Sequence, residues 1–265
     1  MKFFIKTIKI FFIFQLLTSC IPFKDTLYLE KNKEKVADIE INADAYKPYR
    51  LQADDILSIE IKSNNPKDFS VFNKTESINS GIISQDKLYF SGYQIDGFGN
   101  IRIPIIGLLN VKDKTVEEVG ILLEKKLLEE YFTPASNLFV TVKLAGIKYT
   151  INGEIGSTGT NTVFQDKLNI LEAIANSGDI KITGNKKEVV VMRKIPTGYQ
   201  SETLDLTDAN VINSPYFYLK PNDYIYVKPL KQKSTGLGIN GLQSLTTVLS
   251  LFSVLATTYL LIKNL

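Results

Sequence analysis

Acidic side chains are the groups in this sequence most able to do chemistry, because the chain contains no histidine. Without histidine, neither a Ser-His-Asp or Cys-His site nor the common zinc sites can be built. Glycoside hydrolysis needs only two well-placed carboxylates, so the adjacent pair Asp54 and Asp55 is the first candidate. Adjacent strand residues point to opposite faces, however, which suits a shared site poorly. We therefore predict no catalytic residue, no metal ligand and no cofactor.

One acidic position recurs later in the chain. Segments 49–59 and 217–227 share an aromatic residue, a leucine two residues on, an aspartate, and apolar residues after it. The aspartates at this shared position are Asp55 and Asp223. This pattern is typical of a turn whose carboxylate accepts hydrogen bonds from backbone amides, before a strand begins. We predict that both aspartates are structural, and asparagine should preserve such a turn.

The N-terminus has the pattern of a bacterial secretion signal. Three lysines precede an apolar core over 10–17 that is too short to span a bilayer. The next residues, Leu17-Thr18-Ser19-Cys20, resemble the lipobox of bacterial lipoproteins, whose cysteine becomes the acylated first residue of the mature chain. A lone cysteine cannot form an internal disulfide, and the alternative is a buried core cysteine. We predict a signal peptide over 1–19 and lipidation at Cys20, by an acyl group such as palmitate.

The charge of the chain excludes one class of partner. The formal net charge is +3, and the three lysines of the signal account for it. The mature chain is therefore close to neutral. No basic patch dominates it, so we predict that the protein does not bind nucleic acid.

Strand and helix patterns place two domains between the ends of the chain. A charged linker over 20–45 is followed by a first domain, 46–146, and a second domain, 147–230. Apolar and polar residues alternate over 57–61 and 138–144, as in half-buried strands. Each domain combines strands with one helix, which predicts an α+β fold.

Both predicted helices have an N-terminal signature. Thr115 and Glu118 have the spacing of a capping box, in which each side chain bonds to the other residue's backbone amide. Asn169 and Glu172 repeat the spacing in the second domain. We predict helices that begin directly after Thr115 and Asn169.

Glycines mark two predicted turns. Residues 93–103 are expected to form a hairpin that turns at 96–100. Gly153, Gly156 and Gly159 have a spacing found in phosphate-binding loops. Such a loop must lead directly into a helix, and here a further strand-like stretch intervenes. We therefore predict that these glycines belong to a hairpin.

The C-terminal segment, 231–265, is expected to hold a linker and a transmembrane helix over 241–262. As a helix this span would be about 33 Å long, enough to cross a bilayer. Its polar side chains gather on one side at helical spacing, which makes them pore-lining or helix-interface candidates: Gln243, Thr246, Thr247, Ser250, Ser253 and Thr257. The alternative is a simple single-span anchor.

Taken together, these segments resemble the bacterial polysaccharide biosynthesis/export protein family, the Wza-type outer-membrane lipoproteins. The residues that carry the resemblance are 49–59, 92–107, the helix and strand of 115–142, and the flanking lipobox. The second domain resembles the soluble-ligand-binding β-grasp (SLBB) module of that family, through 152–155, 171–175 and 219–223.

The resemblance implies a protein that is not an enzyme. It implies a homo-oligomeric ring whose terminal helices form a porin-like channel across the outer membrane, with lipid-anchored periplasmic domains. The cargo would be capsular polysaccharide or exopolysaccharide, and the partner an inner-membrane polysaccharide co-polymerase, often a tyrosine kinase. Two alternatives stay open: a doubly anchored scaffold or glycan-binding lipoprotein without a pore, and a carboxylate-dependent glycan hydrolase.

Overall fold

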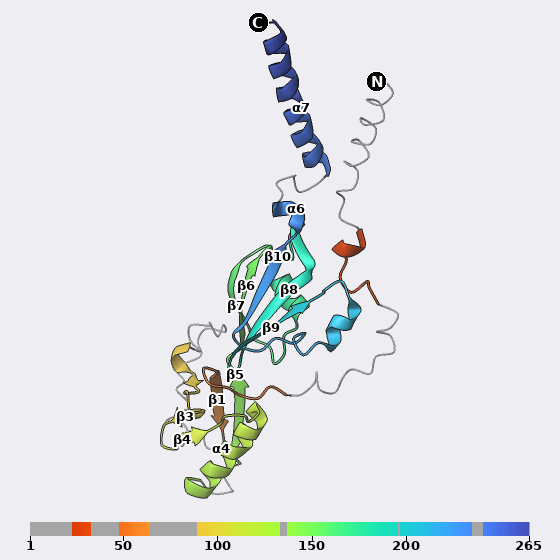
Figure 1. Cartoon of the computed structure of the whole chain (residues 1–265). Coiled ribbons are helices and arrows are strands. Elements are labelled where there is room, and N and C mark those ends of the chain that lie inside the picture. Colours follow the sequence, from red (N-terminus) through yellow and green to blue (C-terminus); the bar gives the residue numbers. More distant parts are fainter. Residues whose placement is uncertain are drawn as a thin grey trace.

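A computed structural model describes residues 23–32, 48–63, 89–132, 137–195, 197–234 and 241–264. The fold is sheet-rich α+β, as the sequence predicted. Figure 1 shows two sheets one above the other, with helix α7 (Gly241–Asn264) at the far end. One sheet contains β1 (Ile56–Lys62) and β5 (Phe139–Leu144), and the other contains β6 (Ile147–Gly153), β8 (Gly184–Ile195) and β10 (Asp223–Pro229). Each sheet has its own hydrophobic core.

The first domain is built around strand β1 (Ile56–Lys62). It lies in the middle of an antiparallel sheet with the order β2-β1-β5, where β2 is Tyr93–Gln94 and β5 is Phe139–Leu144. Helix α4 (Val116–Glu130) buries Val119, Leu123 and Leu127 against this sheet. The predicted capping box of Thr115 and Glu118 is confirmed.

A separate hairpin joins β3 (Asn100–Ile103) to β4 (Gly107–Asn110). The predicted hairpin over 93–103 is therefore wrong, because β2 pairs with β1 and β3 pairs with β4. The carboxylate of Asp96 explains the difference. It accepts hydrogen bonds from the Phe98 and Asn100 amides at 2.9 and 2.8 Å, which forms a tight loop that carries the chain from one sheet to the next.

The second domain has one mixed five-stranded sheet with the order β7-β6-β10-β8-β9. Its central strands β6 and β10 are parallel, and the other neighbours are antiparallel. Its elements are β6 (Ile147–Gly153), β7 (Gly159–Val163), α5 (Ile170–Asn176), β8 (Gly184–Ile195), β9 (Gly198–Leu204), the 3-10 helix η6 (Ala209–Asn213) and β10 (Asp223–Pro229). The first and last strands thus lie side by side, with α5 after the first hairpin. This order supports the β-grasp assignment, which stays a prediction.

Local predictions in the second domain are confirmed. Gly153 ends β6 and Gly159 begins β7 in an antiparallel hairpin. Asn169 and Glu172 form the predicted capping box of α5. Helix α5 is fixed to the sheet by Tyr149, a buried residue whose hydroxyl donates to the Ala173 carbonyl at 3.0 Å.

Residues 23–31, here called the N-terminal strap, lie against the second domain although the first domain follows them in sequence. The strap begins with the 3-10 helix η2 (Phe23–Thr26). Its Leu29 and Lys31 amides donate to the carbonyls of Leu206 and Thr207 at 3.0 and 2.9 Å. The Lys186 ammonium lies 3.7 Å from the centre of the Tyr28 ring. Nothing in the residue pattern predicted this contact.

The predicted transmembrane helix over 241–262 is wrong. Helix α7 (Gly241–Asn264) forms, after the short α6 (Lys231–Ser234). In the described part of the chain, however, no helix is long and apolar enough to cross a membrane. The apolar run of α7 is interrupted by hydroxyl side chains, among them Ser250, Ser253 and Thr257.

Candidate functional site

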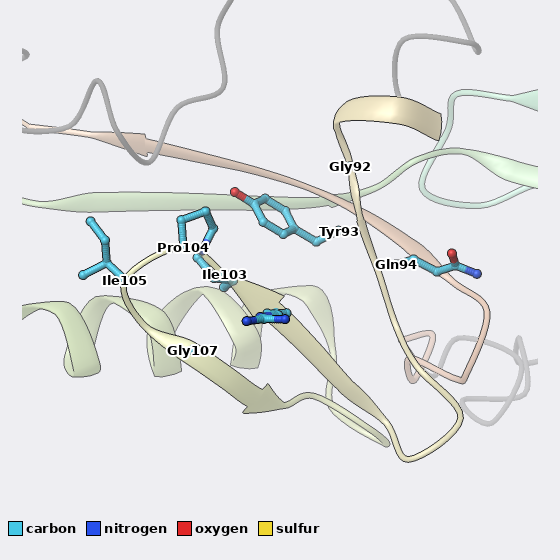
Figure 2. A pocket seen from close by; sticks show the side chains of 8 residues that line it. Gly92, Tyr93, Gln94, Ile103, Pro104, Ile105 and Gly107 are labelled. Carbon is cyan, nitrogen blue, oxygen red and sulfur yellow. The ribbon is translucent and has the colours of Figure 1, made fainter.

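A cleft of about 490 Å³, here called the hairpin cleft, lies beside the β3–β4 hairpin (Figure 2). Two short stretches line it, Gly92–Gln94 and Arg102–Gly107, without Ile106. Tyr93 points toward Pro104 and Ile103, whereas Gln94 points the other way. Adjacent strand residues alternate in this manner, so Tyr93 supplies the aromatic wall of the cleft.

The turn of the hairpin holds an isoleucine in a strained conformation. Ile105 has a φ of 69°, which is exceptional for a β-branched residue. The Ile106 amide donates to the Pro104 carbonyl at 2.8 Å, which closes a three-residue γ-turn around Ile105. The Tyr131 hydroxyl, at the end of α4, donates to the Ile105 carbonyl at 3.0 Å.

The strain has a visible result. Ile106 is 6% exposed and fills the core, whereas Ile105 is 52% exposed at the lip of the cleft. Such strain costs about 1–3 kcal/mol and persists where the surrounding structure enforces it, often at ligand contacts. The hairpin cleft therefore presents an apolar lip at Ile105 and Pro104.

The polar groups of the hairpin cleft are suited to binding rather than to reaction. Arg102 is exposed and offers guanidinium donors. Burial raises the pKa of the Tyr93 hydroxyl, so this group stays neutral near pH 7. Among the residues that the structure describes, no group of three or more His, Cys, Asp or Glu could hold a metal ion. The arrangement fits weak, non-covalent contact with a polar ligand.

The first predicted turn aspartate, Asp55, lies in a tight turn over 52–55. Its carboxylate accepts from the Gln52 amide at 2.9 Å and from the Tyr49 hydroxyl at 2.8 Å. Burial is the main cause that raises the pKa of Asp55 above its usual range. Asp54, next to it, points elsewhere and pairs with Lys194 of the second domain at 3.0 Å. The two carboxylates thus have different partners and do not form a joint site.

The second predicted turn aspartate, Asp223, lies in the corresponding turn over 220–223. Its carboxylate accepts from the Lys220 amide at 2.8 Å. It also forms a buried ion pair with Arg193, whose Nη2 lies 2.7 Å from Oδ2. The same guanidinium donates to the Pro215 and Tyr218 carbonyls at 3.2 and 3.0 Å. Arg193 therefore joins β8 to the whole segment that leads into β10.

Both turns contribute to a second cavity, of about 590 Å³, between the two domains. Tyr49, Arg50 and Gln52 line it from the first domain, and Arg193, Tyr218 and Lys220 from the second. We call it the interdomain cavity. It combines aromatic walls with several cationic side chains.

The remaining predicted site residues lie in α7 or outside the described residues. Cys20 is outside them, and so are the side chains of Gln243 and Thr247. Thr246, Ser250, Ser253 and Thr257 are exposed on α7. The Thr257 hydroxyl donates back to the Ser253 carbonyl at 2.7 Å, a bond within its own helix. A role for these side chains in a pore or a helix interface stays a prediction.

Sequence reasoning missed Arg193 and Ile105. A signal for Arg193 was present, since it continues the inward positions of Val189 and Val191 on a buried strand. An arginine there needs a buried carboxylate partner. The strain at Ile105 had no such signal, because neighbouring Pro104 and Gly107 predict a turn without fixing its φ values.

Comparison with known proteins confirms the predicted family resemblance. Residues 43–145 match the family model described as polysaccharide biosynthesis/export protein. The match covers the Asp55 turn, the hairpin cleft and α4. The matched family is an export family rather than an enzyme family. Its description indicates a role in polysaccharide export or biosynthesis, which places it at the periplasm or outer membrane. A search of curated proteins finds no match. The SLBB and lipoprotein assignments stay predictions.

Proposed function

We propose that this protein exports capsular polysaccharide or exopolysaccharide across the outer membrane. The reason is that residues 43–145 match the family model of polysaccharide biosynthesis/export proteins. The protein would act as a homo-oligomeric channel, held by lipid at Cys20, together with an inner-membrane polysaccharide co-polymerase. The family match is the observation that carries this proposal.

The hairpin cleft supports contact with a moving glycan. A chain in transit needs many weak contacts, because tight binding would stop it. An open cleft with one aromatic wall, one exposed guanidinium and an apolar lip at Ile105 has this character. Arg102 can donate to sugar hydroxyls, and the Tyr93 ring can pack on their C–H faces.

Exposed apolar side chains support assembly of several copies. The first domain leaves large apolar residues in solvent, among them Phe90, Phe98, Leu108, Ile121 and Phe139. Aromatic side chains are enriched in protein–protein interfaces, and three of these residues are phenylalanines. In the proposed ring these residues would lie between neighbouring copies.

A second candidate is a glycan-binding or scaffold lipoprotein that forms no pore. The hairpin cleft supports it as well, because glycan contact there needs no pore. Both candidates share the lipid anchor and the glycan contacts. They differ in whether the protein assembles and whether transport depends on a closed ring.

Deletion of the gene, with complementation by the full chain, tests the proposal. Loss of surface polysaccharide on deletion, with rings of the detergent-extracted protein in electron microscopy, is expected. Unchanged surface polysaccharide would overturn it, and lost export with a strictly monomeric protein would favour the scaffold. Intact-mass analysis should show an acylated Cys20, and an unmodified N-terminus at Met1 would remove the anchor.

Substitution tests the hairpin cleft within the same assay. Arg102→Ala should lower surface polysaccharide without changing assembly, since Arg102 is exposed and outside the core. Lys125→Ala is the matched control, because Lys125 is an exposed cation on α4 that pairs only with Glu129 at 3.8 Å among the described residues. Equal export by both variants would exclude the hairpin cleft as a glycan contact.

A further inference from the structure

The interdomain cavity has the size and walls of a ligand site. Its volume of about 590 Å³ lies within the roughly 300–1,000 Å³ typical of small-molecule pockets. Tyr49 and Tyr218 supply aromatic surface, and Leu144 and Ile147 supply aliphatic surface. The family-matched domain provides only part of this wall, so the cavity exists only where the two domains meet.

Cationic side chains outnumber carboxylates in the lining. Arg50, Lys167, Arg193 and Lys220 face one carboxylate, Asp166. Two of these four cations have a carboxylate partner that does not line the cavity. Arg193 pairs with Asp223, and the Arg50 guanidinium lies 3.7 Å from Glu118. The cavity as a whole still favours an anion.

Lys220 is the cation best placed for a ligand. Among the described residues, no carboxylate lies within ion-pair distance of its ammonium group. Partial burial first, and the nearby Arg193 guanidinium second, lower the pKa of Lys220. Both effects disfavour its charged form, whereas the Asp223 carboxylate favours it, and a bound anion would add a second favourable charge. The turn uses only the backbone amide of Lys220, which leaves the side chain available.

The other polar groups suit a sugar ring. Gln52, Asn213 and Ser214 also line the cavity. Amides and hydroxyls such as these donate to and accept from sugar hydroxyls. The faces of Tyr49 and Tyr218 can pack on the apolar C–H face of a pyranose. A simple inorganic anion would use none of this surface.

We infer that the interdomain cavity binds a carboxylate-bearing sugar unit, with the Lys220 ammonium group meeting its carboxylate and the two tyrosines flanking its ring. This inference rests on the proposed function only in identifying that sugar with the exported glycan, which would then be acidic. The ion pair supplies the preference for acidic over neutral sugars, since charge-assisted hydrogen bonds are the stronger kind.

Calorimetric titration of the full chain in detergent tests this inference, with digalacturonic acid as the probe. Saturable binding is expected, and cellobiose, a neutral disaccharide, should bind roughly tenfold more weakly or worse, about 1.4 kcal/mol. Lys220→Ala should lower the affinity for digalacturonic acid by a similar factor, whereas Lys220→Arg should retain most of the wild-type affinity. Lys181→Ala, at an exposed lysine outside the cavity, should leave binding unchanged.

Three results would overturn the inference: equal affinity for the acidic and neutral disaccharides, no effect of Lys220→Ala, or acetate binding as tightly as digalacturonic acid. The last result would show a site for any carboxylate rather than for a sugar. The binding assay needs no transport, so its failure is distinguishable from failure of the proposed function. Selective digalacturonate binding in a protein whose deletion leaves export intact would uphold the ligand class and reject the export role.

Discussion

The turns at Asp55 and Asp223 have the same backbone but different electrostatics. In each, the aspartate amide donates back to the carbonyl three residues earlier, at 3.3 Å for Asp55 and 3.2 Å for Asp223. The preceding residues, Asp54 and Asn222, have φ values of 76° and 66°. This positive φ at the third turn position, with Ala53 or Pro221 before it, is typical of a type II turn.

The partners of the two carboxylates differ. Asp55 accepts from a neutral phenol, Tyr49, whereas Asp223 is held by the guanidinium of Arg193. A repeated sequence pattern therefore specifies the turn and its amide-to-carboxylate bond. The charge balance around each carboxylate comes from distant residues that the repeat does not include.

The largest expected effect is at the second turn. Asp223→Asn should lower the free energy of unfolding by about 3 kcal/mol, because it leaves Arg193 buried without a counter-charge. Asparagine alone would satisfy the turn, so the Arg193 contact is what changes the expectation for this position. Urea unfolding of the purified protein measures the loss, and the double variant Arg193→Met/Asp223→Asn should recover part of it. A loss below about 1 kcal/mol, the range of exposed pairs, would contradict a buried-pair role.

A smaller effect is expected from Tyr49→Phe at the first turn. This variant removes a hydrogen bond to a carboxylate, which costs about 1.5 kcal/mol near pH 7. Without this bond the pKa of Asp55 should rise further, since the Tyr49 hydroxyl favours the ionised form. The loss should shrink in acid, where Asp55 is protonated. Urea unfolding at several pH values checks this, and a loss independent of pH would show that Tyr49 acts through packing alone.

Asp55→Asn should change stability by less than about 1 kcal/mol near pH 7, well below Asp223→Asn. Burial raises the pKa of Asp55 in the folded state, so the folded protein binds the proton more tightly than the unfolded chain does. The wild type therefore loses stability as pH rises from about 4 through this raised pKa. Asparagine does not titrate, so the variant should gain relative to the wild type over that window. A relative loss there would reverse the assigned sign.

The smallest effect is expected from Asp54→Asn, which gives the first turn the residue type that the second turn has at this position. Asparagine tolerates the positive φ, and the ion pair with Lys194 is exposed. Urea unfolding should show no resolvable change. A clear loss would mean that this pair helps to hold the two domains together.

Local features of the fold could be predicted, because neighbouring residues determine them. The capping boxes at Thr115 and Asn169 and the hairpin at Gly153 and Gly159 depend on side chains within a few positions of each other. The pairing of β3 with β4 could not be predicted in this way. Gly97 and Gly99 predicted a turn correctly, but tertiary packing decides which strands a turn connects.

Features of the candidate sites were harder to predict, since they join distant segments. Arg193 meets Asp223 across 30 positions, and Tyr49 and Lys220 come from different domains to line the interdomain cavity. The polarity of 241–262 was visible in the sequence, where hydroxyl side chains such as Ser250 and Ser253 interrupt its apolar residues.

The N-terminal strap would turn a lipid at Cys20 into an orienting device. Only two residues separate Cys20 from Phe23, so the Cα atom of a lipidated Cys20 would lie at most about 11 Å from that of Phe23. The strap is fastened to the second domain at Leu206 and Thr207, and Lys187 pairs with Asp25 at 2.6 Å. A tether that is also bound to the second domain would limit the rotation of that domain relative to the lipid. The second domain would then lie against the bilayer surface. A force exerted by a polysaccharide in transit would be transmitted to the lipid through the contacts of the strap with this domain.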